Sequence, residues 1–125
     1  MIKYEVRVYT DGTKSWYLNG NLHNEHGPAI EYANGDKHWF LNDKRHNEHG
    51  PAVEWPDGTK SWYLNDKRHN EHGPAIECAS GTKWWYLDGK ELTEAEFNAH
   101  NNPVKELTVA DIEKLVGHPV KIVKD

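Results

Sequence analysis

Three copies of one four-residue motif hold the side chains in this 125-residue chain that are best suited to chemistry. The motif His-Asn-Glu-His recurs every 23 residues and places six of the nine histidines in two columns: His23, His26, His46, His49, His69 and His72. Imidazole binds zinc, copper and nickel, and the motif's glutamate could complete a site. A zinc site needs three or four ligands at one point, whereas columns spread ligands apart. A structural or partner-contacting role is therefore favoured over a metal site.

Tryptophan forms a second set of columns. Trp16, Trp39 and Trp62 recur at the same step, and Trp84 and Trp85 extend them. We expect these large rings to pack as the core between neighbouring repeats. Trp55 and Trp85 depart from the column pattern, so we expect both to be exposed and to mark a binding surface.

Basic residues cluster at the second turn of the middle repeats, as Lys44, Arg45, Lys67 and Arg68. Together with the lysines that precede each tryptophan they predict a basic strip: Lys14, Lys37, Lys60 and Lys83. One interpretation is a set of solvated charges that discourages pairing of strand edges. The other is a contact with anions, either acidic side chains of a protein or the phosphates of a small nucleotide.

Catalysis finds little support. The chain has no serine nucleophile elbow, phosphate loop or paired-carboxylate motif. Cys78 lacks a His-Asn or His-Asp framework in sequence, which favours a packed thiol. An active site needs a few unlike residues that converge once, whereas this chain presents the same residues three times. We therefore expect no enzyme and no cofactor.

Composition excludes several further classes of protein. Lys plus Arg is 15 and Asp plus Glu is 20, which gives a net charge of −5 with histidine neutral. This balance argues against a generic binder of nucleic-acid phosphates. No apolar run approaches the roughly 18 residues of a membrane span, and the N-terminal segment lacks the apolar part of a signal peptide. With a single cysteine and hence no internal disulfide, we expect a cytoplasmic protein.

The motifs lie in tandem 23-residue units, at residues 11–33, 34–56 and 57–79, with a partial unit at 80–92; the first and third agree at 19 of 23 positions. Asp11-Gly12 and its counterparts predict two-residue hairpin turns. Asn19-Gly20 and its counterparts predict a second turn about eight residues later. The segment between them, Lys-x-Trp-aromatic-Leu, favours a strand. We therefore expect a mainly β fold over residues 1–92, an elongated single antiparallel sheet of stacked hairpins.

Residues 93–125 form a different segment, which we expect to cap the array. Thr93 and Glu96 form a capping-box pattern that predicts a short helix. A second helix is expected from a cap at Thr108 to a stop at Gly117. Residues 120–123 are expected to form a terminal strand or an extended docking segment that could also support self-association.

The pattern DG-T-K-x-W-Y-L-N-G…H-x-x-x-G-P-A-x-E resembles the tandem repeats of many bacteriophage and giant-virus proteins, which are similar to variant MORN repeats. The resemblance covers about residues 11–92, and the tail also resembles the ending of such phage proteins. It implies stacked β-hairpins in one elongated sheet and a site of action inside an infected bacterium. Where the resemblance leads us to expect an arginine after the repeated histidine, this chain has Asn24, Asn47 and Asn70.

These features favour a non-enzymatic binding protein that occludes a host protein, such as a component of a bacterial defence system. The candidate contact residues are Trp55, Trp85, Lys44, Arg45, Lys67, Arg68, His46 and His69. A second hypothesis is an oligomeric sponge for a small nucleotide, and a third is a metal-binding histidine array. We expect no membrane partner and no sequence-specific nucleic-acid partner, and a homo-oligomer stays open.

Overall fold

Fourteen short strands and two helices make up the described part of the computed structural model, which comprises residues 2–102, 109–119 and 121. The strands are β1 (Tyr4–Val8), β2 (Lys14–Leu18), β3 (Asn21–Leu22), β4 (Ile30–Glu31), β5 (Lys37–His38), β6 (Phe40–Leu41), β7 (Lys44–Arg45), β8 (Val53–Glu54), β9 (Lys60–Ser61), β10 (Tyr63–Leu64), β11 (Lys67–Arg68), β12 (Ile76–Glu77), β13 (Lys83–Leu87) and β14 (Lys90–Leu92). The helices are α1 (Glu94–Asn101) and α2 (Val109–Val116).

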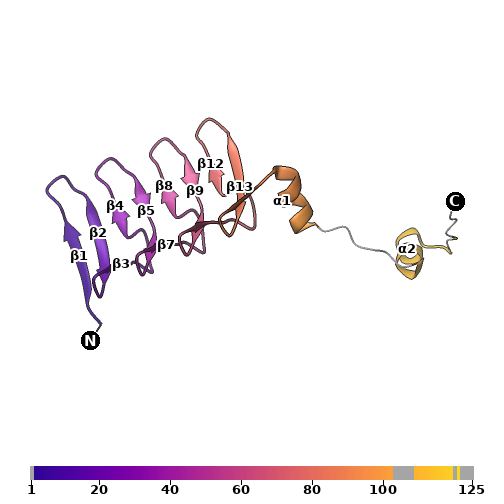
Figure 1. The fold of residues 1–125 in the computed structure, drawn as a ribbon, viewed down its shortest axis with the longest axis horizontal. Coiled ribbons are helices and arrows are strands. Elements are labelled where there is room, and N and C mark those ends of the chain that lie inside the picture. The colour runs from indigo at the N-terminus through magenta and orange to yellow at the C-terminus, as the bar shows by residue number, and fades with distance from the viewer. Residues whose placement is uncertain (1, 103–108, 120, 122–125) are drawn as a thin grey trace.

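The main sheet is open and antiparallel, and its hairpins lie side by side along the array (Figure 1). Its order is β1-β2-β4-β5-β8-β9-β12-β13-β14, with β3 paired to β2. The prediction of a mainly β fold of tandem hairpins is therefore confirmed. Two short ladders, β6–β7 and β10–β11, are separate from the main sheet because the chain changes its pairing partner at Trp39 and Trp62. The Trp39 N–H donates to Ala52 O at 2.7 Å, whereas its carbonyl accepts from His46 N–H at 3.1 Å.

The first turn of each unit is a three-residue loop and not the expected two-residue turn. In the first hairpin Tyr9 N–H donates to Thr13 O at 2.8 Å, and Gly12 N–H donates to Tyr9 O at 3.0 Å. Gly12 has a φ of 96°, while Asp11 is outside the positive-φ region. This is a type I turn followed by a glycine bulge. Asp11 Oδ1 accepts from Thr13 N–H at 2.9 Å, and this bond lowers the pKa of the Asp11 carboxyl.

The second turn has two residues, as predicted, and both take left-handed backbone angles. Asn42 and Asp43 have φ values of 49° and 65°, as a type I′ turn requires. Left-handed angles cost most non-glycine residues about 1–2 kcal/mol, and Asn and Asp adopt them more readily than the others. The Asp43 carboxylate offsets this cost by accepting from Leu22 N–H of the preceding repeat at 2.6 Å. The second turn therefore also links one repeat to the next.

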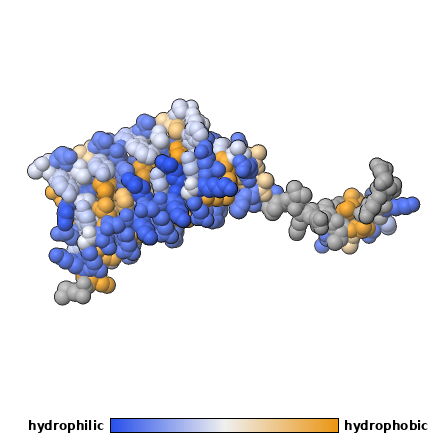
Figure 2. All heavy atoms as spheres, in the orientation of Figure 1, coloured by the Kyte–Doolittle hydropathy of each residue, from blue (hydrophilic) through white to orange (hydrophobic). Residues whose placement is uncertain are grey.

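The buried core is thin. Ala29, Ala52 and Ala75 are 0% exposed and occupy the same position in three units. The repeated tryptophans Trp16, Trp39, Trp62 and Trp85 are half-buried. On the side of the molecule drawn in Figure 2, hydrophobic residues form narrow bands between hydrophilic ones. Each repeat thus buries little apolar surface by itself and depends on its neighbours.

Helix α1 closes the array at the end opposite β1. Thr93 and Glu96 form the predicted capping box, with Glu96 N–H donating to Thr93 Oγ1 and Thr93 N–H to Glu96 Oε1, both at 3.1 Å. The helix lies against β13 and β14 and buries Phe97, which is 4% exposed. Helix α2 is drawn apart from the sheet, beyond residues 103–108 (Figure 1). The expected cap at Thr108 and most of the strand at 120–123 lie outside the described residues. Among those that are described, no helix has the length and apolar character to cross a membrane.

Candidate functional site

The alternation of side chains along the strands gives the sheet two different faces. One row across the strands consists of Ser15, Ile30, His38, Val53, Ser61, Ile76 and Trp84, and we call its side of the sheet the aromatic face. The next row, on the opposite side, consists of Lys14, Glu31, Lys37, Glu54, Lys60, Glu77 and Lys83. We call that side the loop face, because the His-Asn-Glu-His loops line clefts there with Trp39 and Trp62.

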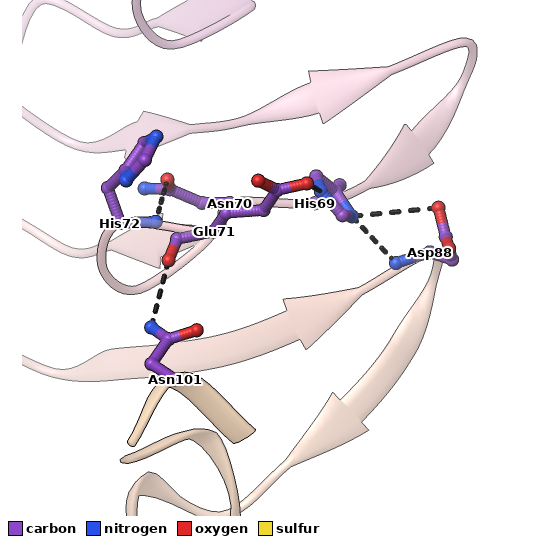
Figure 3. Close-up of polar contacts among 6 residues, drawn as sticks. All are labelled: His69, Asn70, Glu71, His72, Asp88 and Asn101. Carbon is purple, nitrogen blue, oxygen red and sulfur yellow. Dashed lines mark hydrogen bonds and ion pairs between the residues drawn. The ribbon is translucent and has the colours of Figure 1, made fainter. Parts of the chain in front are cut away.

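On the loop face, the first histidine of each motif joins two successive repeats. His46 Nδ1 accepts from Asn65 N–H of the next repeat at 3.0 Å, and His46 Nε2 lies 3.1 Å from Glu48 Oε1. A backbone N–H can only donate, so Nδ1 is unprotonated and Nε2 carries the proton that Glu48 accepts. His23 and His69 make equivalent contacts, and those of His69 are drawn in Figure 3. We call this arrangement the histidine clamp.

The asparagine that follows each clamp histidine closes its own loop. Asn47 Oδ1 accepts from His49 N–H at 3.0 Å, and Asn47 Nδ2 donates to Pro51 O at 2.9 Å. Asn24 and Asn70 bond in the same way. The side chain of His49 is exposed. Sequence reasoning missed this role, although an asparagine stands four residues before the proline in all three units.

Helix α1 takes the place that a fourth loop would have. Asn101 Nδ2 donates to Glu71 O at 2.9 Å, so the helix is bonded to the third loop (Figure 3). Within residues 2–102, 109–119 and 121, no three His, Cys, Asp or Glu side chains come together to hold a metal ion. Both ring nitrogens of each clamp histidine already have partners. The geometry therefore does not favour the metal-binding hypothesis.

The predicted basic strip does not form as one surface. Adjacent strand residues point to opposite sides, so Lys44 lies on the loop face and Arg45 on the aromatic face. Lys67 and Arg68 are divided in the same way. The lysines of the loop face also alternate with glutamates across the strands, as Glu31 does between Lys14 and Lys37. This row is therefore mixed in charge and not basic.

The two arginines connect repeats on the aromatic face. The guanidinium of Arg45 lies 5.3 Å from the ring centroid of Phe40 and 5.9 Å from that of Tyr63. The Arg68 guanidinium lies 5.7 Å from Tyr63 and 5.6 Å from Tyr86. Each cation is thus placed between the rings of two successive repeats, where cation–π attraction holds it. The arginines contribute to the stacking as well as to the surface charge.

Large aromatic side chains are exposed along the aromatic face. Tyr9, Tyr32 and Trp55 stand 23 residues apart at one repeat position and are 47%, 42% and 37% exposed. Trp84, at another repeat position on this face, is 43% exposed. We call these four residues the aromatic row. Cys78, which follows Trp55 at the same repeat position, is a half-buried free thiol. The prediction that Trp55 is exposed is confirmed.

Trp85 is half-buried, and the expectation that it is exposed is wrong. Trp85 stands four residues after the turn glycine Gly81, as Trp62 stands four residues after Gly58. It therefore belongs to the repeated tryptophan column on the loop face. Its neighbour Trp84 points to the aromatic face and is the exposed residue of the pair.

His38 packs among aromatic rings on the aromatic face. Its ring makes edge contacts with Tyr32, at 5.3 Å between centroids, and with Trp55, at 6.5 Å, and it stacks on Phe40 at 6.5 Å. Burial among these rings lowers the pKa of His38 below its ordinary value, and the charge of Arg45 lowers it further. The neutral ring is therefore the form that fits this site.

The candidate site is thus the aromatic row, supported from the loop face by the histidine clamps. Of the residues proposed from sequence, Trp55, Arg45 and Arg68 lie on the aromatic face, whereas His46, His69, Lys44, Lys67 and Trp85 lie on the loop face. A comparison of the chain with protein-family models, curated proteins and solved structures finds no match.

Proposed function

We propose that this protein is a non-enzymatic binding protein that covers a surface of a partner protein with its aromatic face. The observation that carries the proposal is the aromatic row, in which four large aromatic side chains are 37–47% exposed on one side of the sheet. Tryptophan and tyrosine are the residue types that most often supply binding energy at protein interfaces. In the N-terminal part of the array, the row has one exposed ring per repeat, namely Tyr9, Tyr32 and Trp55. The chain as a whole has a net charge of −5.

The dimensions of the sheet suit an extended contact. Neighbouring strands lie about 4.8 Å apart, and each repeat adds two strands, so Tyr9, Tyr32 and Trp55 recur about every 10 Å. Rings at this spacing reach separate parts of one partner surface. The stacked arginines beside them, Arg45 and Arg68, add donors for acidic groups at the rim. From the resemblance to phage repeat proteins, we propose that the partner is a host protein and that binding blocks its function.

The test is a binding measurement with variants of the exposed rings. The protein is used to capture partners from bacterial lysate, and retained proteins and small molecules are both identified by mass spectrometry. Affinity for the purified partner is then compared between the native chain and Trp55→Ser. Loss of a central aromatic anchor costs about 2 kcal/mol or more, so the dissociation constant is expected to rise roughly 30-fold.

Lys60→Ser is the control, because Lys60 is exposed and lies opposite Glu54 on the loop face, away from the aromatic row and from β1. The control is expected to keep native affinity. Equal loss in Trp55→Ser and Lys60→Ser would contradict the assignment to the aromatic face. Retention of a nucleotide and no protein would favour the sponge hypothesis instead, and binding that requires added zinc would favour the metal hypothesis.

A further inference from the structure

The first strand of the sheet presents an apolar strip at an open edge. Tyr4, Val6 and Val8 share the loop face and are 64%, 51% and 67% exposed. Ile2, two residues before Tyr4, is 70% exposed. Among the described residues β1 pairs with β2 alone and is the first strand in the sheet order. Hydrophobic surface reaches this end of the array in Figure 2.

The backbone groups at this edge belong to the same three residues as the apolar strip. Lys3 O accepts from Asn19 N–H, and Tyr9 N–H donates to Thr13 O, both at 2.8 Å, so the odd-numbered residues pair toward β2. Along an antiparallel strand, successive residues direct their N–H and C=O groups to opposite sides of the strand. Tyr4, Val6 and Val8 therefore direct their N–H and C=O groups away from β2. Such an edge is a template for pairing with another strand.

We propose that β1 pairs antiparallel with β1 of a second copy of this chain, about a two-fold axis at Val6. In this register Val6 lies opposite the partner's Val6, and Tyr4 lies opposite the partner's Val8. All three pairs then join residues whose backbone groups point outward, and each pair exchanges two hydrogen bonds. Tyr4, Val6 and Val8 of both copies form one apolar cluster on the loop face.

The charged residues on the other side of β1 favour this register, and they favour a second copy of the chain as the partner strand. Glu5 lies opposite the partner's Arg7, and Arg7 lies opposite the partner's Glu5. Within one chain Arg7 Nη2 is already 3.2 Å from Glu5 Oε2, so the dimer joins two ion pairs into a cluster of four charges. Opposite charges across a strand pair stabilise it, whereas like charges destabilise it.

The two neighbouring registers that keep the same residues pointing outward bring like charges together. A shift of two residues in one direction places Glu5 opposite the partner's Glu5 and Lys3 opposite the partner's Arg7. A shift in the other direction places Arg7 opposite the partner's Arg7. The sequence of β1 is therefore self-complementary in charge in the register centred on Val6.

Dimerisation of this kind has a geometric consequence for the aromatic row. The two-fold axis of an antiparallel strand pair is perpendicular to the sheet, so both copies turn the same face to the same side. The main sheet continues from one copy into the other. Two aromatic rows then lie on one surface, with Tyr9 of each copy nearest the axis.

A cysteine at the axis tests the register directly. In a Cys78→Ser background, Val6→Cys places two thiols opposite each other with Cα atoms about 5.5 Å apart, within disulfide range. Under mild oxidation with copper–phenanthroline we expect most of the protein to run as a covalent dimer. Val8→Cys in the same background is the matched control, because Val8 is similarly exposed but lies opposite Tyr4. Covalent dimer from Val8→Cys, or none from Val6→Cys, would overturn the proposed register.

Charge reversal tests, without cross-linking, whether the partner strand is β1 of a second copy. Glu5→Arg and Arg7→Glu each bring like charges together, so both are expected to raise the dimer dissociation constant at least about ten-fold. A mixture of the two variants restores both opposite pairs and is expected to form heterodimers at the concentration at which each alone is monomeric. Sedimentation equilibrium of the full chain reads out all three samples. A native protein that stays monomeric up to hundreds of micromolar, or a mixture that stays monomeric, would refute the proposal.

Discussion

Replacement of His46 measures how strongly the histidine clamp couples successive repeats. His46→Ala removes the bond from Asn65 N–H at 3.0 Å and the bond to Glu48 at 3.1 Å. A net hydrogen bond contributes about 1 kcal/mol, and the His46 side chain is 10% exposed, so its packing is lost as well. We expect the free energy of unfolding to fall by about 3 kcal/mol. The total free energy of unfolding of most single-domain proteins is about 5–15 kcal/mol.

Two further substitutions separate the bond to the next repeat from the bond within the loop. In His46→Asn the amide oxygen takes the position of Nδ1 and keeps an acceptor for Asn65 N–H. In His46→Gln the amide nitrogen takes the position of Nε2 and keeps the donor to Glu48. Because the clamp acts between repeats, we expect His46→Asn to retain more stability than His46→Gln, by about 1 kcal/mol.

The assay is urea unfolding followed by tryptophan fluorescence, since Trp39 lines the same cleft as His46. His49→Ala is the control: this histidine belongs to the same loop, its side chain is exposed, and we expect a change within about 0.5 kcal/mol. Equal destabilisation by His46→Ala and His49→Ala would refute the clamp. A His46→Gln variant more stable than His46→Asn would show that the contact within the loop dominates.

Three other changes probe the aromatic face and the cap. Burial lowers the pKa of His38, so the folded state favours the neutral ring; stability should fall as pH decreases through about 6.5, where the unfolded chain takes up a proton. The variant His38→Ser carries the residue found at the equivalent positions, Ser15 and Ser61. Between pH 8 and 5 its free energy of unfolding should fall less than that of the native chain. An equal fall would contradict the assignment of this pH dependence to His38. The Ser61 hydroxyl is buried with no hydrogen-bond partner among the described residues, so Ser61→Ala should be neutral or stabilising by about 1 kcal/mol in the same denaturation assay; a loss above that size would point to a bond the geometry does not show. Phe97→Ala should cost about 3 kcal/mol and increase amide exchange first in β13 and β14, whereas uniform exchange along the array would argue against a local cap.

Much of the fold could be predicted because repeat length, glycine positions and strand alternation are properties of the sequence. The 23-residue step and the Asn-Asp or Asn-Gly pairs located the second turns, and Thr93 with Glu96 located α1. The first turns were predicted one residue too short, because Asp11-Gly12 fits both a two-residue turn and the end of a three-residue loop. Which one forms depends on the hydrogen bond of Tyr9 with Thr13, and the residue types alone do not determine that bond.

The candidate site was harder to predict, since it depends on which way side chains point. Trp84 and Trp85 are adjacent and identical in type, and only the count from Gly81 separates the exposed ring from the half-buried one. The same alternation divides Lys44 from Arg45, a signal that was present in the sequence. The partner of His46, by contrast, is a backbone N–H 19 residues away, and no residue type marks a backbone donor.

The two faces differ in how strictly their residues repeat, and the difference follows from the kind of bond that each face makes. On the loop face the residues that hold neighbouring repeats together are the same in three units, namely His-Asn-Glu-His-Gly-Pro-Ala, because their bonds are made to backbone groups at fixed positions. On the aromatic face the corresponding positions vary: Tyr9, Tyr32, Trp55 and Cys78 at one, and Ser15, His38, Ser61 and Trp84 at another. Ser15 and Ser61 are buried, whereas Tyr9, Tyr32, Trp55 and Trp84 are exposed. Under the proposed function, these exposed rings give the repeats different anchors for an irregular partner surface, and the repeated bonds of the loops keep that surface rigid.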